Sequence, residues 1–329
     1  MTEIRLLLES EIRSLLGPKD ALVAVREAFV KLAHGEVVLP GVLGIDIPET
    51  RTEAHVKGAF LRGASYFSVK AASGSYDNPT RGLPVSGGLV MVFDATTGLP
   101  RAILFDNGYL TDLRTGAAGA LAADLLAKKE VNRVGIIGVG TQARYQLDAL
   151  LGVRRLGTIL AYGRSTAKAA AYAREMESRH GVRVAVAPTM EKAVRGSDIV
   201  MTVTPATQPL IQPDWIEDGT HITAVGSDGP AKQELDVRVL QKADKVVADS
   251  LEQCLRLGEI HHAIEAGVFD KADVYGELGE IAAGMKPGRE SDDEITIADL
   301  TGVGVQDSAV ANRVVEEAMR RGLGRILDV

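Results

Sequence analysis

The length, composition and charge of the chain limit the classes of protein to which it can belong. With 329 residues it is longer than one ordinary core, so two domains are expected. A hydrophobic fraction of 46% and a charged fraction of 25% are typical of a soluble globular enzyme. The net charge of -7 argues against nucleic-acid binding, which needs a basic face. We therefore expect a small-molecule ligand.

The N-terminus and the cysteine content indicate a cytoplasmic protein. Residues 1–14 mix charged with apolar side chains and lack the basic start and long apolar centre of a secretory signal. No apolar run approaches the roughly 18 residues that cross a bilayer. Cys254 is the single cysteine, which agrees with a reducing compartment.

The first third of the chain predicts a helix followed by an antiparallel sheet. Residues 10–34 repeat apolar side chains at three- and four-residue spacing, and Ser10 is placed to cap the first turn of this helix. From residue 55 to 107, short apolar or alternating runs are separated by turn clusters, which predicts antiparallel strands. An alanine- and leucine-rich helix then leads to an apolar strand at Val131.

From Val131 onward, strand-like runs alternate with helical runs. Helices are predicted at 141–151, 166–179 and 190–195, and the final helix at about 307–321. Such alternation is typical of a mostly parallel, doubly wound sheet. The predicted fold is therefore α/β, with a Rossmann-type sheet inserted into an α+β domain.

The segment VNRVGIIGVGTQARYQLDAL has the order of a dinucleotide site: strand, glycine turn, helix. Gly138 permits the tight turn, and Gly140 lets the backbone approach a pyrophosphate. Ala143 allows the helix to pack closely on the strand. The free N–H groups and positive dipole end of the helix then favour the phosphates of a nicotinamide dinucleotide.

The next strand carries the signal for the kind of nicotinamide cofactor. It ends in residues 163–166, without the carboxylate that NAD enzymes usually direct at the ribose 2′-hydroxyl. Arg164 can pair with a 2′-phosphate while Ser165 donates a hydrogen bond, which favours NADP over NAD. Alternatively, Ser165 caps the helix and Arg164 is solvated.

Three charged residues stand out from their surroundings. Lys70 lies in an apolar strand and Arg114 in an alanine-rich helix, where either can simply extend its charge to water. Asp228 follows an apolar strand, and ligands of open α/β sheets bind at the carboxyl ends of strands. Its alternative role is that of an Asx-turn residue.

The histidines do not indicate a metal site. None of the six has zinc-ligand spacing with acidic or cysteine partners. His261 and His262 are expected to point to different sides of a helix, which favours a surface role.

Several motifs taken together resemble the ornithine cyclodeaminase and μ-crystallin superfamily. They are DNGYLTDLRTGAAGALAA, VGIIGVGTQARYQ, DIVMTVTPA, AVGSDGPAKQELD and GEI, and the match runs from about Lys70 to the C-terminus. The resemblance is closest to the bacterial ectoine-utilisation branch. It implies a substrate-binding and dimerisation domain of residues 1–115 plus 305–329, a Rossmann domain of residues 116–304, and a homodimer.

The resemblance also implies roles for individual residues. Lys70 and Arg114 would bind the substrate α-carboxylate, and Asp228 would be the acid/base near the substrate nitrogen. The residues implied to bind the cofactor, including those around the nicotinamide, are Gly138, Gly140, Thr141, Gln142, Ala143, Arg164, Ser165, Thr202, Val203, Thr204, Gly302, Val303 and Gly304.

One departure from the family pattern concerns the substrate. Ornithine cyclodeaminases of this family carry a glutamate where this chain has Lys57. A cation there disfavours ornithine and lysine and suits a substrate with an acidic or polar tail. Alternatively, Lys57 is a solvated residue of an edge strand.

These features predict an NAD(P)-dependent reductase or dehydrogenase that interconverts a small α-imino acid and an amino acid. A Lys/Arg clamp holds the reacting carbon near the nicotinamide, and a carboxylate passes the proton. One alternative is an ammonia-releasing cyclodeaminase. The other is a μ-crystallin-like, NADP-dependent ligand-binding protein without catalysis.

Overall fold

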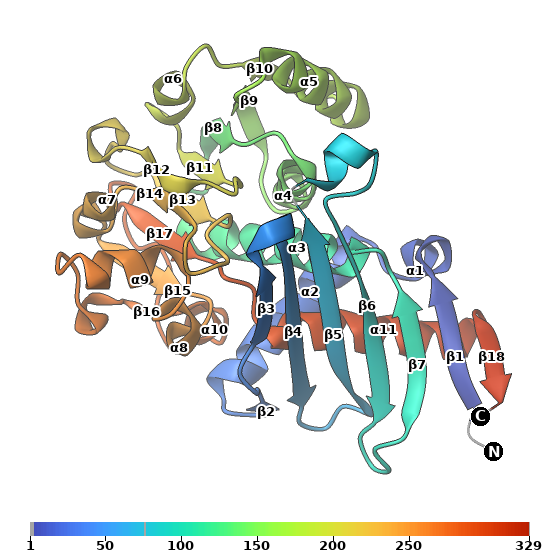
Figure 1. Cartoon of the computed structure of the whole chain (residues 1–329). Coiled ribbons are helices and arrows are strands. Elements are labelled where there is room, and N and C mark those ends of the chain that lie inside the picture. Colours follow the sequence, from blue (N-terminus) through green and yellow to red (C-terminus); the bar gives the residue numbers. More distant parts are fainter. Residues whose placement is uncertain (1–2, 76, 329) are drawn as a thin grey trace. The chain divides into compact units, whose positions relative to one another are not determined.

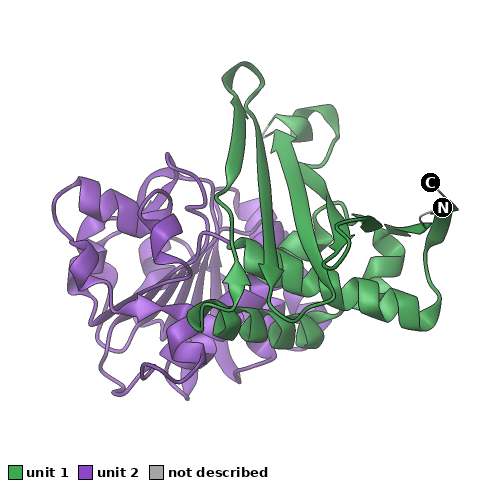
Figure 2. Ribbon diagram, turned by 90° about the horizontal axis from the view of Figure 1, so that it is seen from below, with its two compact units in different colours: residues 1–114, 303–329 green, residues 115–302 purple. Residues whose placement is uncertain are grey.

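The computed structural model describes residues 3–75 and 77–328, which form two compact units (Figure 2). Unit 1 is Met1–Arg114 with Val303–Val329, and unit 2 is Thr115–Gly302. The first boundary lies one residue before the predicted one and the second lies two residues before it. Within the described residues, no helix has both the length and the apolar character needed to span a bilayer.

Unit 1 is built on a largely antiparallel sheet with the strand order β18-β1-β7-β6-β5-β4-β2, to which β3 adds by pairing with β4. Its strands are β1 (Glu3–Leu8), β2 (Val37–Val38), β3 (Leu43–Ile47), β4 (Thr52–Leu61), β5 (Tyr66–Ser75), β6 (Ser86–Asp94), β7 (Pro100–Phe105) and β18 (Arg325–Asp328). Strands β4 to β7 form the antiparallel region that the turn clusters predict. β1 and β18, which the patterns did not predict, join the two ends of the chain as an antiparallel pair.

The N-terminal helix differs from its prediction. Two helices, α1 (Glu9–Leu15) and α2 (Pro18–Ala33), replace the single helix, because Gly17 adopts an extended conformation before Pro18. Ser10 does not cap: it lies inside α1, whose N-cap is Leu8. The C-terminal helix α11 (Gly304–Arg321) packs on α2 and on strands β4 and β5, so helices cover one face of the sheet (Figure 1).

Unit 2 contains an all-parallel sheet in the order β10-β9-β8-β11-β13-β17-β15-β16. These strands are β8 (Val131–Ile137), β9 (Leu156–Tyr162), β10 (Val184–Val186), β11 (Ile199–Thr202), β13 (His221–Ala224), β15 (Lys245–Ala248), β16 (Gly276–Glu277) and β17 (Thr296–Asp299), and β12 (Thr207–Ile211) pairs with β14 (Gln233–Leu235) in a small second sheet. The chain winds outward from β8 in both directions, so the order reverses between β8 and β11. Ligands of doubly wound sheets bind at that position.

Helices alternate with these strands, as the sequence predicts. They are α3 (Tyr109–Leu126), within which the first unit boundary falls, α4 (Thr141–Leu151), α5 (Thr166–His180), α6 (Met190–Val194), α7 (Val237–Lys242), α8 (Leu251–Cys254), α9 (Gly258–Glu265) and α10 (Leu278–Ala282). Apolar clusters lie on both faces of the sheet: Ile199 and Met201 belong to one and Val200 to the other. Burial on both faces explains why these strands are continuous apolar runs.

Candidate active site

The turn between β8 and α4 has the geometry that a dinucleotide needs. Gly138 has a φ of 108°, a left-handed value that favours glycine, and a Cβ there would lie 2.8 Å from the carbonyl oxygen of Val203. Gly140 is the N-cap of α4, and a Cβ on it would meet nothing within 4 Å. Ala143 is fully buried beneath this turn. The turn therefore presents bare backbone and the N-terminus of α4, which suits a pyrophosphate.

At the end of β9, the structure supports the capping alternative for one residue. Ser165 is the N-cap of α5, where its Oγ accepts a hydrogen bond from the backbone N–H of Lys168 at 3.3 Å. Arg164 is exposed. A serine hydroxyl that accepts a cap bond still carries a hydrogen to donate, so capping does not remove Ser165 as a ligand for a ribose or phosphate oxygen.

The segment after β11 is held by a carboxylate that the sequence analysis missed. Thr202 is buried at the end of β11, and Val203 and Thr204 follow it. Glu234 in β14 accepts hydrogen bonds from the backbone N–H and the hydroxyl of Thr204 at 2.6 and 2.7 Å. Burial raises the pKa of Glu234 to about 7, although these donors oppose the shift.

Asp228 lies in the loop that follows β13. Its carboxylate accepts a hydrogen bond from the ammonium of Lys232 at 2.7 Å, and 46% of its side chain is exposed. Lys232 itself is largely buried, with 12% of its side chain exposed. The loop therefore holds a partly accessible carboxylate with a fixed cationic neighbour, at the strand edge where ligands of such sheets bind.

Unit 1 contains a buried cluster of charged side chains. Asp307 of α11 accepts hydrogen bonds from Lys70 of β5 and from Nε of Arg114 of α3, both at 3.0 Å. All three side chains are at most 6% exposed. Arg114 also donates to Gln306 at 2.9 Å. The structure thus places Lys70 and Arg114 together and adds Asp307 and Gln306, two adjacent polar residues at the start of α11 that the sequence analysis missed.

The electrostatics of this cluster suit an anionic ligand. Burial lowers the pKa of Lys70 to about 8, although Asp307 opposes the shift. Burial also acts to raise the pKa of Asp307, but Arg114 and Lys70 outweigh it and hold that pKa below its usual value. Asp307 therefore stays ionised beside two cations, and a ligand carboxylate would find positive charge already in place.

Lys57 joins the same cluster. It lies directly opposite Lys70 in the register of β4 and β5, so the two side chains share one face of the sheet. Lys57 is only 6% exposed, and β4 is not an edge strand because it also pairs with β2 and β3. The alternative of a solvated edge-strand lysine is therefore wrong.

Gly302, Val303 and Gly304 are buried between β17 and α11. The backbone N–H of Gly302 donates to Asp249 at 2.7 Å. A Cβ on Gly304 would lie 2.6 Å from the carbonyl oxygen of Gly58, so only glycine fits there. Their assignment to the nicotinamide stays a prediction.

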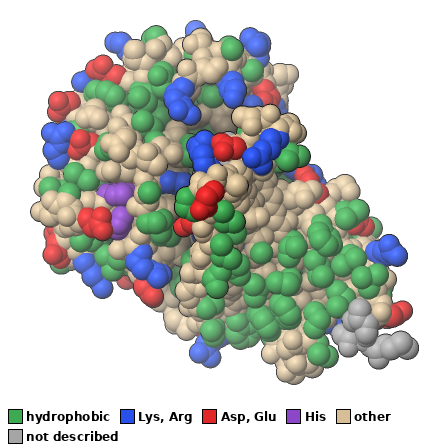
Figure 3. All heavy atoms as spheres, viewed as in Figure 1, with side chains coloured by type: hydrophobic (Ala, Val, Ile, Leu, Met, Phe, Trp, Pro, Cys, Tyr) green, Lys and Arg blue, Asp and Glu red, His purple; other side chains and the backbone are tan. Residues whose placement is uncertain are grey.

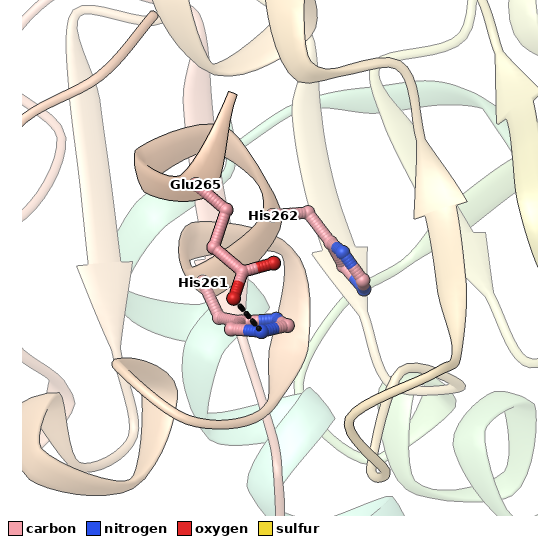
Figure 4. Close-up of side chains that lie close together, drawn as sticks. All are labelled: His261, His262 and Glu265. Carbon is pink, nitrogen blue, oxygen red and sulfur yellow. Dashed lines mark ion pairs between the residues drawn. The ribbon is translucent and has the colours of Figure 1, made fainter. Parts of the chain in front are cut away.

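His261 and His262 do not point to different sides of α9, and that prediction is wrong (Figure 4). Their ring centroids are 4.4 Å apart, in edge contact. His261 Nε2 lies 3.3 Å from the carboxylate of Glu265, while His262 Nε2 donates to the carbonyl oxygen of Lys232 at 2.8 Å. One ligand-capable atom from each of His261, His262 and Glu265 lies within 4.8 Å of the others, and Glu265 is 70% exposed. His261 Nδ1 is buried without a hydrogen-bond partner among the described residues.

The fold and the site define a class: a two-unit protein in which unit 2 has a Rossmann-type fold and unit 1 contains a buried cluster of cationic side chains. A family model described as the ornithine cyclodeaminase/mu-crystallin family matches residues 2–322. The chain belongs to this family.

Three solved structures are similar to this chain over nearly its whole length. An archaeal alanine dehydrogenase dimer with bound NAD is 40% identical, with a TM-score of 0.93 and 99% of each chain covered. Delta(1)-pyrroline-2-carboxylate reductase of Thermococcus litoralis, in complex with NADH and L-proline, is 33% identical, with a TM-score of 0.94 and coverage of 99% of this chain and 100% of that one. Iminosuccinate reductase of Paracoccus denitrificans, with NAD+, is 31% identical, with a TM-score of 0.89 and full coverage of both chains.

Proposed function

We propose that this chain is an NAD(P)-dependent oxidoreductase that interconverts a small imino acid and the corresponding amino acid. The observation that carries the proposal is the buried pairing of Lys70 and Arg114 around Asp307, which is a preformed site for a carboxylate. The similar alanine dehydrogenase, pyrroline-2-carboxylate reductase and iminosuccinate reductase support this class of reaction, since all three names describe chemistry at the C–N bond of an amino or imino acid.

Each proposed residue has a distinct task. Lys70 and Arg114 bind the substrate carboxylate and so fix the carbon next to it, which must reach near-attack distance. When bound, the nicotinamide supplies or accepts the hydride at that carbon. Asp228 gives or takes the proton at the substrate nitrogen, and the ammonium of Lys232 keeps its carboxylate oriented. Thr202 to Thr204 and Gly302 to Gly304 would line the nicotinamide.

Lys57 bears on the side chain of the substrate. Lys57 adds a second buried positive charge directly opposite Lys70 on the same sheet face. We therefore favour an imino acid whose tail is acidic or polar over one with a basic tail.

For the cofactor, we propose binding at Gly138, Gly140, Thr141, Gln142 and Ala143. Arg164 and Ser165 would contact the 2′ position. The relatives with bound cofactor hold NAD or NADH. The exposed guanidinium of Arg164 and the lack of an acid at the end of β9 nevertheless favour a 2′-phosphate, so we propose that NADP(H) is used at least as well as NAD(H).

We also propose a homodimer formed through the open face of the unit 1 sheet. Figure 3 shows apolar side chains gathered over this sheet. The exposed ones include Leu43, Ile45 and Ile47 of β3 and Phe105 of β7. Contiguous apolar surface of this kind marks interfaces, and the similar alanine dehydrogenase is a dimer. A cytoplasmic location stays a prediction.

A substrate screen tests the proposed activity. Oxidation of NADPH and NADH should be followed with pyrroline-2-carboxylate, with iminosuccinate, and with keto acids plus ammonia or methylamine. We expect turnover with at least one imine, and a higher kcat/KM for acidic or polar tails. Absence of turnover in both directions would rule out the proposal, and ammonia release from a diamino acid without net change in NADH would identify a cyclodeaminase instead.

A further inference from the structure

The fully buried carboxylate of Glu234 connects the loop after β11 with the loop after β13. Glu234 uses one oxygen to accept the two hydrogen bonds from Thr204, in the loop after β11. Its other oxygen accepts the backbone N–H of Gly226 at 2.8 Å, in the loop after β13. The side chain of Glu234 has no exposed surface. It therefore acts as a fixed spacer between the ends of two neighbouring strands.

These loops have different tasks in the proposed function. The first contains Val203 and Thr204, which would line the nicotinamide. The second leads from Gly226 to Asp228, the proposed acid/base, within two residues. Hydride transfer and proton transfer act on the two ends of one C–N bond, so the two loops must keep a constant separation.

Close packing prevents the loops from adjusting by themselves. A Cβ on Gly226 would lie 2.1 Å from the carbonyl oxygen of Thr204 and 2.6 Å from Glu234 Oε2. On the other side, a Cβ on Gly138 would lie 2.8 Å from the carbonyl oxygen of Val203. The nicotinamide-lining segment is thus held between the glycine turn and Glu234.

Glu234 is itself fixed from below by further buried carboxylates. Glu259 of α9 accepts the backbone N–H groups of Glu234 and Leu235 at 2.8 and 3.1 Å. Asp299, at the end of β17, accepts the N–H of Ile260 at 3.0 Å. Glu259 and Asp299 are each 1% exposed. These bonds anchor β14 to α9, and α9 in turn to β17.

We propose that Glu234 is a positioning residue that sets the nicotinamide-lining segment and the Asp228 loop in register for coupled hydride and proton transfer. This inference rests on the proposed function. The role requires a carboxylate, because the groups directed at Glu234 are donors and an amide would turn its NH2 toward one of them. A glutamine has the same shape but cannot satisfy the same three donors.

Glu234→Gln tests the proposal in the full-length protein. We expect kcat to fall about 100-fold, the loss that a displacement of about 1 Å at a reacting centre produces. The Kd of NADH, measured by fluorescence, should change less than about threefold, because the phosphate-binding turn is untouched. The primary deuterium isotope effect with NADH deuterated at C4 should rise, because hydride transfer becomes slower than product release.

Two further variants separate positioning from a general loss of stability. Val239→Ala removes buried apolar volume from the cluster that also contains Leu235, and should lower Tm without changing kcat or the isotope effect. If Glu234→Gln does not fold, Gly226→Ala disturbs the same contact from the other side and should give the same fall in kcat. An unchanged isotope effect and kcat in a folded Glu234→Gln or Gly226→Ala protein would overturn the inference, whereas an inactive wild-type protein would instead refute the proposed function.

Discussion

The two units bury charge in opposite ways. In unit 1, Lys70 and Arg114 share one carboxylate, Asp307, and the bonds run between side chains. In unit 2, the buried carboxylates Glu234 and Glu259 accept hydrogen bonds largely from backbone N–H groups. A side-chain cation can leave one carboxylate for another. A hydrogen bond from a backbone N–H group instead fixes the position of the main chain. In the proposed function, the buried charge of unit 1 receives a ligand and that of unit 2 fixes loops.

The largest effect, on kcat, is expected at Asp228, a carboxylate of unit 2 that is partly exposed. Asp228→Asn keeps the shape of the side chain and removes its proton transfer, so kcat should fall by a factor of about 10² to 10⁴. Affinity for NADPH and NADH, measured by titration of fluorescence, should stay nearly constant. Equal losses in turnover and in cofactor affinity would contradict the assignment of acid/base work to Asp228.

The second effect concerns the carboxylate that balances the cations of unit 1. Asp307→Asn leaves Lys70 and Arg114 buried without their counter-charge, which should cost about 3–5 kcal/mol in the free energy of unfolding. Urea denaturation measures the loss, and a carboxylate substrate should restore part of it. Glu27→Gln is the matched control, because it breaks the exposed pair of Glu27 with Arg313 and should cost less than about 1 kcal/mol.

The third effect distinguishes the apolar surfaces of the two units. Ile45→Lys places a charge on the open face of the unit 1 sheet, where Ile45 is 53% exposed. If that face pairs with a second copy, the variant should shift the protein from dimer to monomer in light scattering after size-exclusion chromatography, because an unpaired charge would become buried. Met285→Lys, at a residue of unit 2 that is 49% exposed, should leave the dimer intact. A dimer that survives Ile45→Lys would argue against this face.

The fourth effect is a pH dependence on the alkaline side, which the side-chain cluster of unit 1 should show. Lys70, with a pKa of about 8, loses its charge as the pH rises through that value, so kcat/KM should fall up to about tenfold per pH unit above it. Between pH 8 and 10.5 the unfolded chain binds the proton that the folded chain has released, so this residue should make stability rise with pH. Lys70→Arg keeps its charge and should remove the alkaline fall in kcat/KM.

The smallest effect concerns the exposed end of β9. Arg164→Ala should lower kcat/KM with NADPH by about tenfold or less, the worth of an exposed charge pair. Activity with NADH should be unchanged, because NADH has no 2′-phosphate. If the variant keeps the wild-type kcat/KM with both NADPH and NADH, Arg164 is only a solvated residue.

The features that sequence predicts well here are those with a local cause. The parallel strands of unit 2 were evident because burial on both faces demands continuous apolar runs, and the turn at Gly138 was evident because its conformation demands glycine. Local residue pattern therefore identified the parallel strands and the glycine turn of unit 2.

The residues that sequence missed depend on contacts between distant parts of the chain. Asp307 and Gln306 look like ordinary polar residues at the start of a helix until folding brings them to Arg114. Glu234, in QELD, looks like part of a polar loop, and only the structure shows it fully buried. Strand β18 (Arg325–Asp328) has no partner near it in sequence, because it pairs with the other end of the chain.

The division of unit 1 into two distant segments also sets an order for biosynthesis. Asp307 is separated from Lys70 by 237 positions and from Arg114 by 193. On the ribosome, both cations are therefore synthesised long before their counter-ion, and α11 emerges only after all of unit 2. Strands β1 to β7 of unit 1 are therefore synthesised before α11, which packs on β4 and β5. By then all strands of unit 2 are present, so unit 2 can fold first.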